Sequence, residues 1–469
     1  MPKISAELKR GLALIAVIAA YIVIMAIPTP AGLTPEGQRA IAMMVCVVIC
    51  WVTEVVPILI TSVLFIFVTY LLGLNTESGA VKDFASPTVF FVFASMLLAY
   101  ALENSGLNKR LALKMTVLSK GKPKPLILYM MIGTAILSTV ISNVPACAAF
   151  FFIVKALCEQ NNCEKGTSNF AKAGIIGVIF GAMVGGNATP AGSSLNVLGL
   201  NLLRQSTGMS LSFSEWTLFG LPVVIVMIPL LWLVVVRVFP PEFEQLAGVE
   251  DSKKELEQMG KFTKQEIKFM VISTLMLIFW FSEKYLHNIS VSASTMAFAT
   301  LYFCPGINLL TYDYMKDKLD WTLIIMIGAS GTFGAAMFNT GASSWLANTF
   351  LGPFANASPL LLAFIIATFC TVIKILIPSN PACVTIMVPT LAAFSLDTGI
   401  PLMMLYLPMA FTISASWLLP FDPVPLICWP DRFFSIKDFF KAGVWGHIVL
   451  IFVAVAVVMI IGTPLGYFR

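Results

Sequence analysis

The feature that most constrains this chain is a short polar break that occurs twice inside long apolar runs. The first break, residues 142–147, reads Ser-Asn-Val-Pro-Ala-Cys, and the second, residues 379–383, reads Ser-Asn-Pro-Ala-Cys. An unsatisfied backbone polar group is costly in hydrocarbon, so a broken helix persists there only if it lines a cavity or is buried in protein. Two matching breaks in the two halves of a chain indicate a transport site near the middle of a membrane.

The composition identifies the environment of these runs. Hydrophobic residues make up 58% of the 469 residues and charged residues only 11%, whereas a soluble domain carries roughly 25% charged residues. Apolar runs of the length that a spanning helix needs, about 20 residues, recur from end to end. The sequence therefore predicts an all-α polytopic membrane protein, located in the cell (inner or plasma) membrane.

Basic clusters between the apolar runs predict an orientation, because cytoplasmic loops are enriched in Lys and Arg. The clusters lie at the N-terminus (Lys3, Lys9 and Arg10) and at 109–124, 253–268, 316–318 and 432–441. Eleven crossings and two re-entrant hairpins place every cluster in the cytoplasm, with the N-terminus inside and the C-terminus outside. The net charge of +5 resides in these loops, so no nucleic-acid partner is expected.

The hairpins are predicted at the two runs that contain the Ser-Asn breaks, 125–157 and 357–396. The crossings are predicted at 12–27, 39–54, 57–73, 86–104, 169–205, 215–237, 269–285, 290–304, 320–340, 401–429 and 442–463. Two of these crossings contain clusters of Gly, Pro, Ser and Asn, at 185–196 and 414–425, that cannot form a continuous helix. Free carbonyls at such unwound segments could coordinate a cation; the alternative is a kink without a ligand.

The repeat extends beyond the Ser-Asn breaks. Ala-Ser at 94–95 precedes Glu-Asn-Ser-Gly at 103–106, and Ala-Ser at 329–330 precedes Phe-Asn-Thr-Gly at 338–341. The two predicted helices run in opposite directions, which indicates inverted repeats; the alternative is chance similarity of small-residue helices. The predicted domains are N-terminal scaffold helices (1–85), a first repeat (86–237), a cytoplasmic linker (238–268), further scaffold helices (269–319) and a second repeat (320–469).

Each hairpin tip would present serine, asparagine and the free amides of a helix N-terminus, which together favour a carboxylate. Two facing tips would hold a molecule with an anionic group at each end, such as succinate, malate, 2-oxoglutarate, tartrate or citrate. With these motifs in this order, the whole chain resembles the divalent-anion/sodium symporter family, also called the INDY-type dicarboxylate transporters. The resemblance implies one sodium site per half, homodimers and a transport domain that moves like an elevator.

The resemblance also implies roles for individual residues. Sodium ligands of the first half fall on Ser138, Asn143 and Gly192, with Asn196 in the adjoining turn. Substrate contacts fall on the tips and turns of both halves: Ser142, Asn143, Val144, Ser193, Ser379, Asn380, Pro381 and Pro423. Val144 and Pro381 replace the tip threonines of the family and have no side-chain hydroxyl to offer the substrate.

The second half departs further from the family pattern. Lys374 precedes Ile375, which stands where a threonine is usual, and Asp422 aligns with the small residue that donates a carbonyl to the second sodium. A charge within a membrane costs at least about 2.5–3.5 kcal/mol and usually has a partner and a function. We predict that the Lys374 ammonium substitutes for the second sodium and pairs with Asp422; a purely structural role is the alternative.

This reading favours an anion exchanger, with a sodium-coupled dicarboxylate symporter that uses the first site as the alternative. A channel is a further alternative. No His-x-x-x-His or Gly-x-Ser-x-Gly motif lies in an apolar run, so an enzyme is not expected. No cofactor is expected apart from sodium at one site. The two histidines, His287 and His447, are expected at the membrane interface.

Overall fold

The computed structural model describes residues 6–377, 379–420 and 422–468, and all regular structure within these ranges is helical. The all-α prediction is therefore confirmed. Lys3 of the N-terminal basic cluster and Phe421 of the second unwound segment lie outside the described residues. Seven of the described helices are long and apolar enough to cross a membrane, and several shorter apolar helices accompany them. The number of crossings, eleven, stays a prediction.

The longer helices of the first half are α1 (Ala6–Ala26), α2 (Pro35–Thr53), α3 (Ile58–Leu71), α5 (Pro87–Ser105), α7 (Pro123–Ser138), α8 (Asn143–Gln160), α9 (Asn169–Gly185), α10 (Ser194–Thr207) and α11 (Phe213–Val238). Those of the second half are α13 (Lys264–Leu286), α14 (Val291–Leu301), α16 (Trp321–Asn339), α18 (Pro359–Leu376), α19 (Asn380–Thr398), α20 (Leu402–Ile413), α21 (Pro423–Cys428) and α22 (Ile436–Gly462). Five further helices, of five to twelve residues, were not predicted, because they are too short or too polar to stand out as apolar runs: α4 (Glu77–Lys82), α6 (Leu107–Leu118), α12 (Val249–Gln258), α15 (Tyr312–Lys316) and α17 (Ala342–Phe350). The helix α21, in the second unwound segment, is also short, with six residues.

Helices end and begin at the four breaks that the sequence predicts. The Ser-Asn breaks separate α7 from α8 and α18 from α19, and the unwound segments separate α9 from α10 and α20 from α21. Pro145 and Pro381 lie in the first turns of α8 and α19. Proline is tolerated in a first turn because the N–H that it lacks would have no partner within the helix. The breaks therefore follow from local chemistry.

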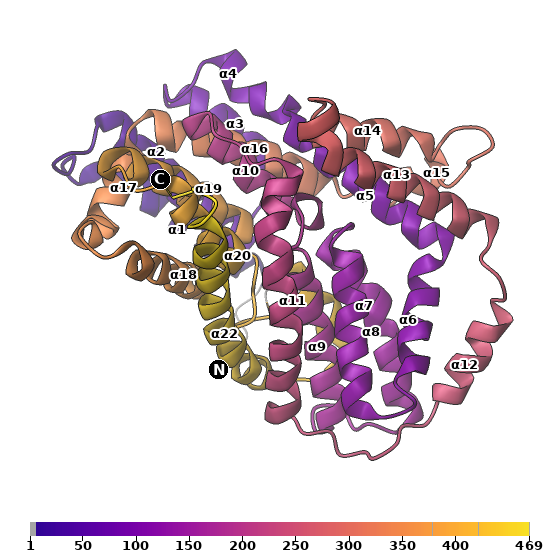
Figure 1. Cartoon of the computed structure of the whole chain (residues 1–469). Coiled ribbons are helices and arrows are strands. Elements are labelled where there is room, and N and C mark those ends of the chain that lie inside the picture. Colours follow the sequence, from indigo (N-terminus) through magenta and orange to yellow (C-terminus); the bar gives the residue numbers. More distant parts are fainter. Residues whose placement is uncertain (1–5, 378, 421, 469) are drawn as a thin grey trace.

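The two halves of the chain pack in a corresponding way. Both helices of the first pair, α7 and α8, pack against α9, and both helices of the second pair, α18 and α19, pack against α20. Each half also contacts the other: α8 touches α21, and α19 touches α10. Figure 1 shows α7, α8 and α9 side by side, with α11 between them and α22. The breaks are thus brought together at the centre of the fold.

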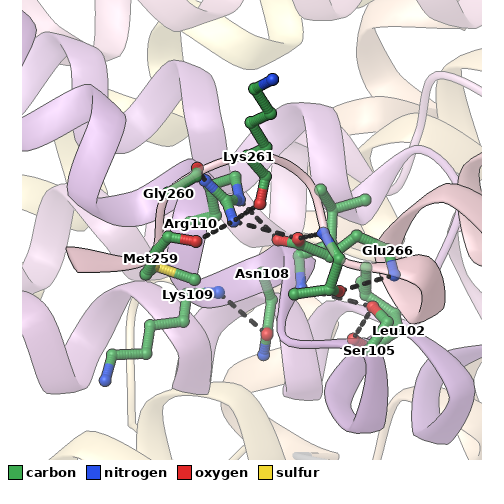
Figure 2. A network of polar contacts seen from close by, with 11 residues as sticks. Leu102, Ser105, Asn108, Lys109, Arg110, Met259, Gly260, Lys261 and Glu266 are labelled. Atoms are coloured by element: carbon green, nitrogen blue, oxygen red, sulfur yellow. Dashed lines mark hydrogen bonds and ion pairs between the residues drawn. The ribbon is translucent and has the colours of Figure 1, made fainter. Parts of the chain in front are cut away.

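The short helix α6, which leads from α5 into the α7–α8 pair, is fastened at its first turn. The Arg110 guanidinium donates to both carboxylate oxygens of Glu266, at 2.5 and 3.0 Å, and both side chains are buried. It also donates to the main-chain carbonyls of Met259, Gly260 and Lys261 (Figure 2). Glu266 in turn caps the start of α13. The helix that leads into the α7–α8 pair is therefore bonded to the start of α13.

Helix α22 passes very close to the second unwound segment at Gly443. A Cβ atom at this position would lie 1.8 Å from the main-chain oxygen of Trp417, so no larger residue fits without displacing the segment. This approach places the next turn of α22, with His447, against the carbonyl of Ala415.

Gly443→Ala is therefore expected to destabilise the protein. Overpacking of a tight contact typically costs about 1–3 kcal/mol of the free energy of unfolding. The midpoint of thermal unfolding in detergent, followed by size-exclusion chromatography, should fall. Gly352→Ala is the matched control, because a Cβ at Gly352 has no atom within 4 Å. Equal midpoints for Gly443→Ala and wild type would contradict the close approach.

Candidate functional site

The two Ser-Asn breaks have the same local structure. Ser142 and Ser379 are the residues that precede the first turns of α8 and α19, and both are half-buried. Neither side chain caps its own helix. The hydroxyls, together with the first-turn amides, are therefore free to bind an anion. The flanking residues Val144 and Pro381 are also half-buried.

The first half gathers main-chain and side-chain oxygens around Asn143. The Ser138 hydroxyl lies 2.7 Å from the Asn143 side-chain oxygen and 2.7 Å from the carbonyl of Ala182. The same corner of the Asn143 amide lies 3.2 Å from Ala182 O and 3.0 Å from Gly192 O. The orientation that satisfies these groups places the amide nitrogen at this corner, where it donates to the carbonyls of Ala182 and Gly192. With the oxygen at this corner, the surrounding oxygens would need a cation between them. A neutral cluster of this kind suits a hard cation such as sodium.

The turn after α9 holds this oxygen cluster in place. The Asn196 side-chain nitrogen donates to the carbonyls of Gly186 and Thr189, at 2.8 and 2.9 Å. The Thr189 hydroxyl donates to Thr139 O in the first break, at 2.5 Å. A Cβ at Gly192 would lie 2.5 Å from Gly186 O, so only glycine allows this approach. Ser138, Asn143, Gly192 and Asn196, predicted from the sequence as a group, do lie together.

Asn196 and Ser193 also make hydrogen bonds within the turn that the sequence did not predict. The Asn196 amide uses its nitrogen to hold the turn, so it faces carbonyls as a donor. The buried hydroxyl of Ser193 accepts a hydrogen bond from Leu195 N at 3.3 Å and caps α10. Both residues therefore support the turn, whatever else they bind.

The corresponding cluster in the second half carries formal charges. Lys374, near the end of α18, donates to the carbonyl of Ile413 at 2.6 Å. The Asn380 amide donates to the Asp422 carboxylate, and Ser416 donates to Asn380 Oδ1 at 3.0 Å. Asp422 also accepts from Val424 N at 3.0 Å and so caps α21. Pro423, the next residue, is exposed.

Lys374 and Asp422 do not form the direct ion pair that we predicted. Among the described residues, Lys374 is bonded to Ile413 O, and Asp422 to Asn380, Ser416 and Val424. Both side chains are buried and line one small cavity of about 20 Å³. The α20 C-terminus explains the difference, because its free carbonyls carry partial negative charge and attract the ammonium.

The predicted position of His447 at the membrane interface was also wrong. It lies in the interior at 3% exposure, not at the interface, and lines the same cavity as Lys374 and Asp422. Its ring nitrogens lie 2.9 Å from the carbonyls of Gly443 and Ala415. The sequence gives little signal for this position, because His447 follows Asp422 by a long interval and sits in an ordinary apolar helix.

The unwound segments of the two halves contact each other directly. Asn187, after α9, donates to Phe411 O at 3.0 Å and accepts from the Ser414 hydroxyl at 2.7 Å. Both side chains are buried. Sequence reasoning identified both segments but not this contact, since no spacing rule relates them. Two hydrogen bonds of Asn187 therefore join the segment after α9 to the end of α20.

Paired helix breaks, clustered at the centre of an all-helical fold with apolar spans, define a membrane transporter. The sequence model of the sodium:sulfate symporter transmembrane region matches residues 8–468. The chain therefore belongs to the sodium:sulfate symporter family, which is the family that the sequence motifs resemble. This family consists of multi-pass membrane transporters and not of enzymes.

Two relatives illustrate the family at similar distance. The sodium-dependent dicarboxylate transporter SdcS of Staphylococcus saprophyticus is 25% identical over 93% of this chain and 88% of its own length. A membrane protein of Cupriavidus necator is 25% identical over 92% of this chain and 88% of its own length.

Two solved structures share the fold. The YdaH transporter of Alcanivorax borkumensis has a TM-score of 0.52 at 14% identity, over 86% of this chain and 88% of its own. MtrF of Neisseria gonorrhoeae, described as one of a class of antimetabolite efflux pumps, has a TM-score of 0.56 at 12% identity, over 97% of this chain and 95% of its own. At these identities the likeness concerns the fold alone.

Proposed function

We propose that this protein is a secondary active transporter of di- or tricarboxylates that works as an anion exchanger. The substrate class is supported by relatives named as sodium-dependent dicarboxylate transporters. It is also supported by the two uncapped tips, whose serines and first-turn amides would each receive one carboxylate.

The observation that favours an exchanger over a sodium symporter is the position of Lys374. Its ammonium lies 2.6 Å from Ile413 O, at the end of α20 next to the second unwound segment. Main-chain carbonyls of such broken helices coordinate the coupling ion in many secondary transporters. A tethered ammonium stabilises these carbonyls without being released to either side of the membrane. The second half would then contribute no transported sodium.

Sodium-coupled symport through the first half is the second candidate. It is favoured by the neutral oxygens around Asn143, contributed by Ser138, Ala182 and Gly192. A sodium ion at their centre would fix the amide oxygen inward. Ser138, Asn143 and Gly192 would then be ligands of a transported ion.

The remaining architecture is proposed on the same basis. The α7–α8 and α18–α19 pairs would be re-entrant hairpins of two inverted repeats (86–237 and 320–469), and their corresponding packing supports this. They would move together, as the transport domain of an elevator, against the scaffold helices at 1–85 and 269–319, with 238–268 as cytoplasmic linker. A homodimer would form through that scaffold, with the N-terminus cytoplasmic and the C-terminus outside.

Counterflow in proteoliposomes tests the proposal. Vesicles loaded with unlabelled succinate, malate, 2-oxoglutarate, tartrate or citrate should take up the labelled anion without sodium on either side. Sodium should change this uptake less than about twofold, and an inward sodium gradient should not drive net uptake into empty vesicles. Sodium-dependent net uptake would replace the exchanger by the symporter. No counterflow with any anion of the panel would overturn both.

A further inference from the structure

The His447 side chain is placed where only its protonated form makes both of its hydrogen bonds. Nδ1 lies 2.9 Å from Gly443 O, and Nε2 lies 2.9 Å from Ala415 O. A neutral imidazole has one N–H, whereas an imidazolium has two. In the neutral form, one of the two contacts therefore brings a nitrogen lone pair against a carbonyl oxygen. These two contacts favour the imidazolium, whereas burial of the ring and the Lys374 ammonium in the same cavity oppose it.

His447 faces a carbonyl just after the end of α20, and Lys374 donates to the last carbonyl of that helix. Lys374 binds Ile413 O, and His447 faces Ala415 O two residues later. This stretch follows the C-terminus of α20, where free carbonyls and the helix dipole attract positive charge. Two basic side chains, from α18 and α22, therefore converge on one helix end. The first half has neutral groups at the corresponding place.

Few charged groups face the His447 ring. Lys374 from α18 and Asp422 from the start of α21 share its cavity, and they are the charged side chains that line it. The segment after α20 presents the Ala415 carbonyl and the Trp417 ring, whose centroid is 5.2 Å from that of His447. The α11 side of α22 presents apolar Leu231, beside Gly446.

The cavity between these groups has room for a water molecule. Its volume is about 20 Å³, and about 10–15 Å³ is enough for one water with several polar partners. Trp417 also lines the cavity, and its buried indole nitrogen has no hydrogen-bond partner among the described residues. A water here could accept from Lys374 and donate to Asp422. Protons could then move between buried groups through a short polar path.

The net charge of the second half shows what a proton on His447 would contribute. A sodium ion held by neutral oxygens adds one positive charge to a site for a dianion. Lys374 adds the same charge, but the nearby Asp422 carboxylate cancels it. Lys374 alone therefore leaves the second half neutral. An imidazolium at His447 restores a net charge of plus one.

We propose that Lys374, Asp422 and His447 form a proton-binding site in which a proton on the His447 ring takes the place of the coupling cation of the second half. The proposal rests on the proposed function as a carboxylate carrier. The proton comes from solution and returns to it, with no other bond made or broken. Binding of the dianion and protonation of His447 then reinforce each other, because coupling between two ligands is reciprocal.

Proton uptake on substrate binding tests this directly. Purified carrier in weak buffer at about pH 8 receives the anions of the counterflow panel, adjusted to the same pH, and a pH-sensitive dye reports the change. Wild type should take up about one proton per carrier, since an unperturbed histidine is neutral at this pH. His447→Gln, which keeps an amide donor, should take up none. If wild-type carrier performs counterflow but takes up no proton when the anion binds, the proton site is overturned.

The pH profile of counterflow gives a second readout that a structural role for His447 would not move. Wild-type counterflow should fall about fivefold or more as the pH is raised and the imidazolium is lost. Over the same pH range, counterflow by His447→Gln should change less than about twofold, whatever its absolute rate; if this variant fails to fold, Asp422→Asn serves instead.

Asp422→Asn removes the charge that cancels Lys374. Counterflow by this variant should therefore lose its pH dependence while His447 is still present. Parallel pH profiles for wild type and these variants would overturn the proposal. Counterflow that fails for every anion of the panel would instead overturn the proposed function, and the proton site with it.

Discussion

Lys374→Ala is expected to reduce counterflow at least about tenfold, the equivalent of about 1.4 kcal/mol in free energy. The substitution leaves the carbonyl of Ile413 and the carboxylate of Asp422 without the ammonium that lies near both. Removing one partner of a buried charged cluster leaves an uncompensated charge, which commonly costs about 3–5 kcal/mol. Initial rates of succinate counterflow in proteoliposomes, normalised to the amount of reconstituted carrier, measure the effect.

A double variant separates transport from stability in this experiment. Lys374→Ala with Asp422→Asn removes both charges, so the midpoint of thermal unfolding should return towards that of wild type. Counterflow should remain low, because no tethered cation is left at the end of α20. Lys374→Arg keeps the positive charge and should retain more activity than Lys374→Ala. A wild-type rate in Lys374→Ala would refute the role proposed for the ammonium.

Arg110→Ala is expected to have the largest effect on stability. Glu266 is fully buried and receives two of its hydrogen bonds from the Arg110 guanidinium. Losing one partner of a buried pair lowers the free energy of unfolding by about 3–5 kcal/mol. The carbonyls of Met259, Gly260 and Lys261 lose a donor as well. The yield of monodisperse protein and its thermal midpoint in detergent should both fall.

Two comparisons make the Arg110 result specific. Lys316→Ala removes an exposed ion pair with Asp313, which lies three residues earlier, and should change the midpoint little. Arg110→Met with Glu266→Gln removes both buried charges and should be less destabilised than Arg110→Ala. If Arg110→Ala and Lys316→Ala melted alike, the buried pair would not be what fastens α6 to α13.

Much of the architecture could be predicted from local sequence. Proline in the first turns of α8 and α19, and clusters of Gly, Pro, Ser and Asn after α9 and α20, interrupt helices wherever they occur. The five short helices were not predicted, because length and apolarity were the criteria and these helices lack one or both. The residues of the first oxygen cluster were predicted as a group from the resemblance to the divalent-anion/sodium symporter family.

The arrangement of charge in the second half could not be predicted in this way. Lys374 and Asp422 were identified as buried charges, but their direct pairing was wrong because the free carbonyl of Ile413 competes for the ammonium. His447 was placed at the interface because it is a single polar residue in an apolar helix. Its burial depends on the approach of α22 at Gly443, a long-range contact that leaves no local pattern.

The sequence by itself determined the all-α membrane fold, the positions of its helix breaks and the family to which the chain belongs. The fold and the breaks follow from apolar run length and from the backbone chemistry of proline, glycine and asparagine, which act over a few residues, and the family follows from the order of the motifs. Only the tertiary structure decided which polar groups meet: Asn143 with neutral oxygens, and Lys374 with a helix end beside Asp422 and His447. The reason is that such contacts depend on how distant helices pack, and hydrogen-bond partners are set by distances of a few ångströms.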